Sequence, residues 1–171
     1  MKTNYLLTIK AGDRPGLLHL LTGVLNRKLI PVASISAAPT DIQGIVLVTM
    51  EVAASEKALQ PLLSKIENLI EVFAVETLSL EKAVTIRSAF FLLDKRVLAS
   101  PQALAISKLG GEIVNLHPDT IIVSKSGSDA VIRQLYDALD GPFLLGFSQT
   151  GLIADSALIN NDESSVIRRA A

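Results

Sequence analysis

Residues 5–41 read YLLTIKAGDRPGLLHLLTGVLNRKLIPVASISAAPTD. In residues 5–10, one set of side chains (Tyr5, Leu7 and Ile9) alternates with another (Leu6, Thr8 and Lys10), as in a half-buried strand. A loop rich in glycine follows, and the leucines after it repeat at helical spacing. A second stretch with strand character then ends at Ala38-Pro39-Thr40-Asp41. This segment therefore predicts a strand, a loop, a helix and another strand in succession.

The loop Ala11-Gly12-Asp13-Arg14-Pro15-Gly16 places two glycines and a proline around an acid–base pair. It lies where a strand meets the N-terminus of a helix, whose first backbone N–H groups lack intrahelical acceptors and carry partial positive charge. Such a position suits the carboxylate of a small ligand. We predict that the N–H groups of Gly16, Leu17 and Leu18 bind a carboxylate and that Asp13 binds an ammonium group.

A purely structural interpretation of the same loop stays open. Asp13 could cap the helix, with Arg14 solvated and Pro15 at the first helical position. Capping and ligand binding use the same N–H donors, so the two interpretations are compatible.

Other polar segments favour structural roles. Ser126-Gly127-Ser128 could form an anion-binding nest, but a simple helix cap is the preferred interpretation. His19 lies among leucines and His117 beside a turn proline, so a structural or solvated role is expected for each. Asp94-Lys95-Arg96 is expected to form a solvated surface turn.

Composition narrows the function classes. The 171 residues are 49% hydrophobic but only 4% aromatic, which predicts an aliphatic core. A formal net charge of −1 gives no basic footprint for nucleic acid. The sequence has no cysteine, and its two histidines lack ligand spacing, so disulfides, thiolate catalysis and a zinc site are not expected. With no signal-peptide pattern and no apolar run long enough for a membrane span, we expect a cytoplasmic protein.

Apolar periodicity predicts the order strand, helix, strand, strand, helix, strand, and the same order then repeats. The expected strands are 5–10, 32–38, 45–52, 72–80, 84–93, 112–116, 120–125 and 144–150, and the expected helices are 17–29, 55–66, 101–109 and 129–139. Pro61 would lie inside the second helix, which must then start later or bend.

Short connections and right-handed crossovers favour an α+β fold of two successive ferredoxin-like βαββαβ sandwiches. Glu81 and Lys82 mark the expected boundary between them. We predict domains at 1–80 and 83–155, and a disordered polar tail at 156–171.

Known catalytic fingerprints do not occur. The glycine loop lacks the lysine of a P-loop and the spacing of a dinucleotide fingerprint, and there is no GxSxG elbow. A small enzyme using carboxylates such as Asp94 or Asp119 is the least favoured hypothesis, because no paired acids or clustered histidine accompany them. The chain is therefore expected to have no catalytic residues and no bound metal.

Several segments together resemble the small regulatory subunit of acetolactate synthase (acetohydroxyacid synthase), whose first half is an ACT domain. The matching segments cover residues 3–155: the first strand, Arg14-Pro15-Gly16-Leu17, the helix to Arg27, Ala38-Pro39-Thr40-Asp41, Gly111-Glu112-Ile113-Val114-Asn115-Leu116 through Gly127, and Phe147-Ser148-Gln149-Thr150-Gly151. The Arg-Pro-Gly loop occurs in many ACT domains, whereas the Ala-Pro-Thr-Asp ending is more specific.

The resemblance implies a non-catalytic subunit of branched-chain amino acid biosynthesis. It would pair with itself through the ACT domain, activate a separate catalytic subunit and confer feedback inhibition by valine. Thiamine diphosphate, Mg and any FAD would belong to that catalytic partner, and this chain would hold no cofactor. A free-standing ACT-type amino-acid sensor or transcriptional modulator with another partner is the alternative.

The resemblance also implies an effector site shared between two subunits. The residues assigned to it are Asp13, Arg14, Pro15, Gly16, Leu17, Leu18 and Pro31. Asp13 and Pro31 each stand where the family commonly has Asn. Because Pro31 has no side-chain donor, we predict weak or absent valine binding.

Overall fold

The computed structural model describes residues 3–80 and 84–154. These form two compact units, one comprising the residues up to Val84 together with those from Gly151, the other Thr85–Thr150. The elements of the first unit are β1 (Thr3–Gly12), α1 (Leu17–Arg27), β2 (Val32–Pro39), β3 (Ile45–Ala54), α2 (Glu56–Glu67), β4 (Val72–Ser79) and β9 (Ile153–Ala154).

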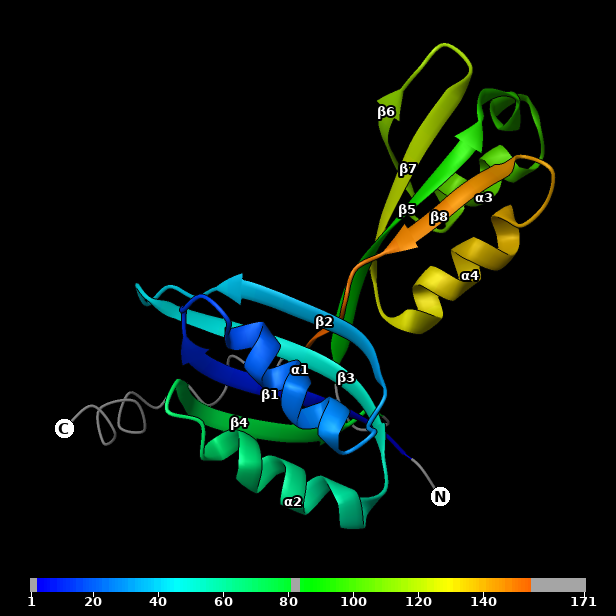
Figure 1. Ribbon diagram of the computed structural model, residues 1–171. Coiled ribbons are helices and arrows are strands. Elements are labelled where there is room, and N and C mark those ends of the chain that lie inside the picture. Colours follow the sequence, from blue (N-terminus) through cyan, green and yellow to red (C-terminus); the bar gives the residue numbers. More distant parts are fainter. Residues whose placement is uncertain (1–2, 81–83, 155–171) are drawn as a thin grey trace. The chain divides into compact units, whose positions relative to one another are not determined.

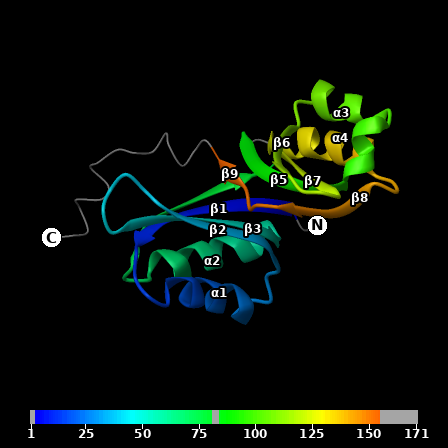
Figure 2. The same cartoon turned by 90° about the horizontal axis from the view of Figure 1, so that it is seen from above.

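The first unit is a helix layer on an antiparallel sheet with strand order β2-β3-β1-β4. Both helices cover the same face of that sheet (Figures 1 and 2). Alternate residues of β1, among them Leu7 and Ile9, point toward the helices and are fully buried. They pack with Leu21 and Leu25 of α1 and with Leu62 of α2 in one aliphatic core.

The second unit repeats this topology with strand order β6-β7-β5-β8. Its elements are β5 (Thr85–Asp94), η1 (Lys95–Ala99), α3 (Gln102–Lys108), β6 (Glu112–Leu116), β7 (Thr120–Gly127), α4 (Asp129–Leu139) and β8 (Leu144–Gln149). Its core includes Phe91, Val123 and Leu135, and the tilted ring of Phe147 packs against Phe91 at 5.1 Å between ring centroids. The predicted fold class, two successive βαββαβ sandwiches, is confirmed.

The last described residues cover part of the opposite face of the first sheet. Leu152 and Ala154 form a small apolar cluster with Leu6, which points away from the helices and is nevertheless fully buried. The prediction had assigned residues up to 155 to the second domain, whereas residues 151–154 lie with the first unit. A half-buried pattern in β1 gave no sign of this second contact.

Three local details differ from the sequence prediction or sharpen it. Pro61 lies inside α2, which begins at Glu56 and continues through it. Asp94-Lys95-Arg96 does not form a simple turn, because it opens the 3₁₀ helix η1 with Asp94 as the cap. Ser128 occupies the N-cap position of α4 but makes no side-chain capping bond.

Two predictions concern residues that the structure does not describe. The proposed boundary at Glu81 and Lys82 and the polar tail at 156–171 both lie outside the described residues. Within residues 3–80 and 84–154, no helix is long and apolar enough to span a membrane.

Candidate functional site

The loop after β1 contains a tight turn fixed by its sequence. The Leu17 N–H donates to the Arg14 carbonyl oxygen at 3.2 Å, which closes a four-residue turn. Pro15 and Gly16 are its central residues, and Gly16 has φ 88° and ψ −5°. This is a type II turn, in which proline suits the first central position and the second requires positive φ, hence glycine. The Arg-Pro-Gly motif therefore determines the angle at which α1 starts.

Two backbone hydrogen bonds hold the loop against neighbouring turns. The Gly12 N–H donates to the Glu71 carbonyl oxygen at 2.8 Å, and the Asp13 N–H donates to the Gly44 carbonyl oxygen at 2.8 Å. The β1–α1 loop is thereby joined to the turn before β4 and to the β2–β3 turn. Such a loop presents its exposed side chains from a fixed backbone.

A cavity of about 250 Å³ lies between this loop, the start of α1 and the adjoining faces of β2 and β3. It is lined by Asp13, Arg14, Gly16, Leu17, Leu18, His19, Ala37, Val46 and Val48. Five of the seven residues predicted for the effector site are therefore brought together here. Charged groups lie at the loop and apolar side chains come from the strands, which suits a small molecule with both a charged and an apolar end.

The donors at the start of α1 differ in part from the prediction. The Leu17 N–H is engaged in the turn, so it is not available to a ligand. Among the described residues, the N–H groups of Gly16, Leu18 and His19 donate to no backbone carbonyl. The interpretation of Asp13 as the helix cap is wrong, because Gly16 is the N-cap residue and no side chain caps α1. Asp13 is exposed instead and faces the cavity.

Pro15 and Pro31 do not line the cavity within one chain. Pro15 is an exposed residue of the turn. Pro31 immediately precedes β2, whereas the loop lies beside the β2–β3 turn at the other end of that strand. One chain therefore does not bring Pro31 to Asp13, and a shared site would need the start of β2 from another chain.

The sequence prediction missed the strand residues and the histidine of this cavity. Ala37, Val46 and Val48 share one face of the sheet, because Ala37 pairs with Val48 in the β2–β3 register. His19 lies one residue beyond the predicted donors and is exposed. The signal that could have found these residues is the pairing of β2 with β3 across a short turn.

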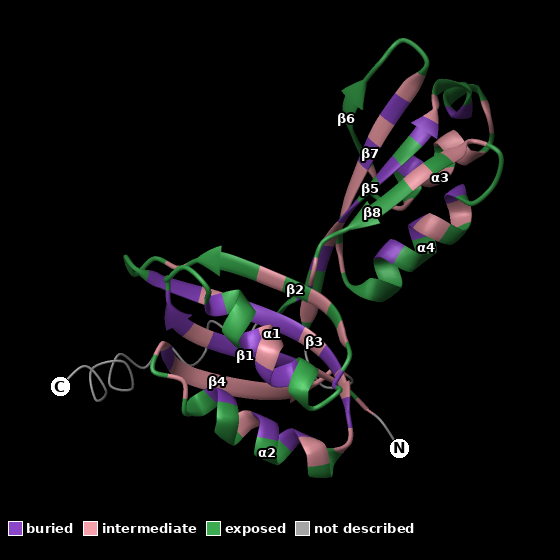
Figure 3. Cartoon of the chain, in the orientation of Figure 1, coloured by how far each residue is buried: buried purple, intermediate pink, exposed green. Residues whose placement is uncertain are grey.

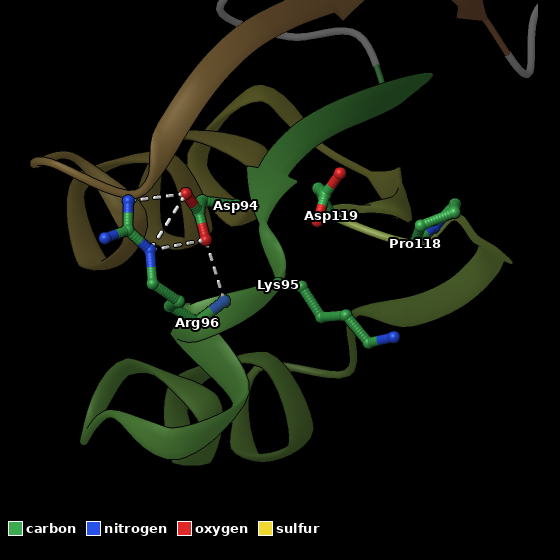
Figure 4. Close-up of a pocket in the computed structure, with 5 residues that line it drawn as sticks. All are labelled: Asp94, Lys95, Arg96, Pro118 and Asp119. Atoms are coloured by element: carbon green, nitrogen blue, oxygen red, sulfur yellow. Dashed lines mark hydrogen bonds and ion pairs between the residues drawn. The ribbon is translucent and has the colours of Figure 1, made fainter.

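The second unit has a hollow at the topologically equivalent place, between the loop after β5 and the β6–β7 turn. The carboxylate of Asp94 lies at this hollow and accepts hydrogen bonds from Arg96 (Figure 4). It accepts the Arg96 backbone N–H at 2.8 Å and the Arg96 guanidinium at 2.7–3.1 Å. The hydrogen bonds from the Arg96 side chain, and then the one from its backbone N–H, lower the pKa of Asp94 to about 2.

The two loops therefore differ in how their helix N-terminus is satisfied. The second unit supplies a carboxylate from its own chain, whereas the first leaves its donors open beside a cavity. Among the described residues, no group of three or more histidine or acidic side chains is placed to hold a metal ion.

No protein-family model matches the chain. It is 25% identical to the acetolactate synthase small subunit of Haemophilus influenzae, over 88% of this chain and 94% of that protein. It is 20% identical to a probable acetolactate synthase small subunit of Methanothermobacter thermautotrophicus, over 89% of this chain and 92% of that protein.

The fold agrees with that of a solved protein of the same name. The crystal structure of the acetolactate synthase small subunit from Thermotoga maritima matches with a TM-score of 0.80, covering 88% of this chain and 95% of that one, at 16% identity. The match extends over both units. The resemblance to acetolactate synthase small subunits drawn from the sequence is confirmed by these comparisons.

Proposed function

We propose that this chain is the small, regulatory subunit of an acetolactate synthase. It has no catalytic activity of its own, and it binds and activates a separate catalytic subunit that carries thiamine diphosphate. The observation that carries this proposal is the end-to-end similarity, in sequence and in fold, to proteins of that name. The exposed loop beside a cavity, with charge at one end and apolar strands at the other, supports a sensing role.

The surface around the cavity supports a homodimer through the first unit. β2 is an edge strand, and the helix layer leaves its helix-facing side partly uncovered. Ile35 is 37% exposed there, beside exposed Ala37, and Leu18 of α1 is 43% exposed. A second copy that covers this edge would satisfy the unpaired backbone groups of β2 and bury these side chains. It would also bring its own Pro31 toward a shared site.

Regulation would then act through the arrangement of the two ACT domains. A ligand at their interface shifts that arrangement only if it binds the two states unequally, and the catalytic partner would read the difference. The amide groups of Leu18 and His19 would bind the carboxylate of an amino acid, and Asp13 its ammonium group. Pro31 offers no side-chain donor, so valine should bind weakly or not at all.

Reconstitution tests the central proposal. The full chain is mixed with an acetolactate synthase catalytic subunit, and complex formation and acetolactate production are measured. We expect a stable complex and a faster reaction. If mixing gives neither, the regulatory role is refuted and the alternative of a free-standing ACT-type sensor gains support.

Sedimentation of two matched variants tests the homodimer. Ile35→Glu places a charge on the β2 edge and should convert a dimer to a monomer. Ile70→Glu is the control, since Ile70 is 94% exposed in the turn before β4, at the opposite edge of the sheet. Equal behaviour of the two variants would argue against an interface at β2.

Calorimetry tests the effector prediction. Titration of valine into the wild-type dimer should give little or no heat. Tight valine binding would contradict the inference from Pro31 while leaving the reconstitution result unaffected.

A further inference from the structure

The sheet of the second unit has one face that its own helices, α3 and α4, do not cover. Along β5, buried residues alternate with exposed or half-buried ones (Figure 3). The buried set packs with α3 and α4, and successive side chains of a strand lie on opposite faces, so the other set lies on the face away from these helices. The strand register places their neighbours on the same side. We define the open face of the second sheet by Ile86, Ser88, Phe90 and Leu92 of β5, Ile122, Ser124 and Ser126 of β7, and Gly146 and Ser148 of β8.

Large apolar side chains on this face are exposed. Phe90 is 54% exposed, Ile86 52% and Leu92 38%. The corresponding face of the first sheet is different, because it carries Lys10 and Glu76, which pairs with Thr8, and because Leu6 on that face is covered. The face opposite the helices is therefore partly covered and carries charges in the first sheet, whereas in the second sheet it is apolar and exposed.

The open face of the second sheet has no charged residue. Its polar groups are serine hydroxyls, and two of them, on Ser88 and Ser126, bond to each other at 2.6 Å. A charged residue on the same side of this sheet lies on the edge strand β6, where Glu112 pairs with Ser124 in the register. An apolar centre with a polar rim is the pattern of a protein interface, and an ionic ligand would find no partner at this centre.

On this face, large apolar side chains lie next to small residues. Phe90 stands between Ser124 on one neighbouring strand and Ser148 on the other. Leu92 stands beside Gly146, which has no side chain. A two-fold axis between two copies would place the large side chain of Phe90 in each copy over the small residues of the other. Because the face has no charged residue, two identical faces do not repel each other.

We propose that the open face of the second sheet packs against the same face of a second copy of this chain, with Phe90 of each copy seated over the serine and glycine positions of the other. The inference rests on the proposed homodimer through the first unit. From strand spacing and rise, the face covers roughly 330 Å² per copy. A stable interface needs about 800 Å² per partner, so the contact is weak between separate molecules. Within a dimer already joined by its first units, the second contact is intramolecular and this area suffices.

Cross-linking of the full chain tests the proposal, because the sequence has no native cysteine. Ser148→Cys places a thiol on the face, and Ser107→Cys places one on the exposed side of α3 as a control. Packed sheets lie ~10 Å apart, so a bismaleimide can span them. At dilute protein concentration, we expect the Ser148→Cys dimer to cross-link at least tenfold faster than the control.

A second substitution identifies the contact. Adding Phe90→Ser to Ser148→Cys should reduce cross-linking at least tenfold while the dimer persists in sedimentation. Adding Leu104→Ser instead should leave cross-linking unchanged, since Leu104 is 62% exposed but lies in α3. Circular dichroism checks that each variant is folded.

The outcomes separate the two proposals. A wild-type chain that sediments as a monomer refutes the homodimer and, with it, the paired faces. A dimer in which Ser148→Cys cross-links no faster than Ser107→Cys keeps the homodimer and overturns only the face pairing. A dimer whose cross-linking is indifferent to Phe90→Ser also overturns it.

Discussion

Two glycines of the first unit should respond in opposite ways to the same substitution. Gly16 has φ 88° and no atom within 4 Å of an added Cβ, so its requirement is conformational and not steric. Gly16→Ala should destabilise the chain by about 1–2 kcal/mol, because a side chain disfavours the left-handed region. Gly23 lies inside α1 with equally open space. Gly23→Ala should stabilise it by about 0.5–1 kcal/mol through lower backbone entropy of the unfolded chain. Urea denaturation measures both, and shifts of the same sign would contradict this reasoning.

Asp94 should make stability depend on pH in the acid range. Its pKa is lowered to about 2, so the folded state favours the carboxylate more than the unfolded state does. The resulting stability is fully present above the unfolded-state pKa and is lost as pH falls toward 2. NMR titration of the Asp94 carboxyl group measures the value directly. In Arg96→Gln the pKa should rise, because the largest cause is removed, yet stay below normal, since the backbone N–H bond remains. An unchanged pKa in that variant would show that the side-chain bonds are not its cause.

The helix α2 contains a proline that should lower its stability. Pro61 lies in the helix interior and is exposed. Because proline has no backbone N–H, one intrahelical hydrogen bond is missing there, and the exposed ring buries little apolar surface in return. Pro61→Ala should raise stability by about 1–3 kcal/mol. Gln60→Ala, the exposed neighbour in the same helix, should change it by only a few tenths. Thermal unfolding distinguishes them, and a loss of stability in Pro61→Ala would mean that the proline shapes a contact of α2.

The elements were predictable where their information is local. Alternation in β1, leucine spacing in α1 and the Arg14-Pro15-Gly16 turn each follow from neighbouring residues, and their order fixes the βαββαβ topology. The cavity was only half predictable, because its loop side is contiguous in sequence whereas Ala37 and Val46 reach it through strand pairing. The capping of η1 by Asp94 depends on side-chain geometry that a three-residue polar run does not specify.

At the scale of the whole molecule, the chain returns to its first unit after completing the second. This return was not predictable, because it depends on single residues meeting across more than half of the sequence rather than on a periodic pattern. In the sequence, nothing distinguishes Leu6 from other residues of an alternating strand, and its burial comes from contact with Leu152. The first unit is therefore complete only when residues far beyond its own last strand are present.

Leu152 should consequently control the stability of the first unit from outside its βαββαβ segment. Leu152 is 1% exposed and packs on the fully buried Leu6. Leu152→Ala removes buried methyl groups and leaves a cavity, which costs about 2–5 kcal/mol at buried sites. Ile153→Ala is the matched control, since Ile153 is 58% exposed and its truncation should change stability little. Hydrogen exchange measured strand by strand is the decisive readout. Amide protection should fall in β1 and β4 while β7, which contributes to the separate core of the second unit, keeps its protection. Equal loss in both sheets would show that the units unfold together, and no loss in either would show that the Leu6 cluster contributes nothing to the first unit.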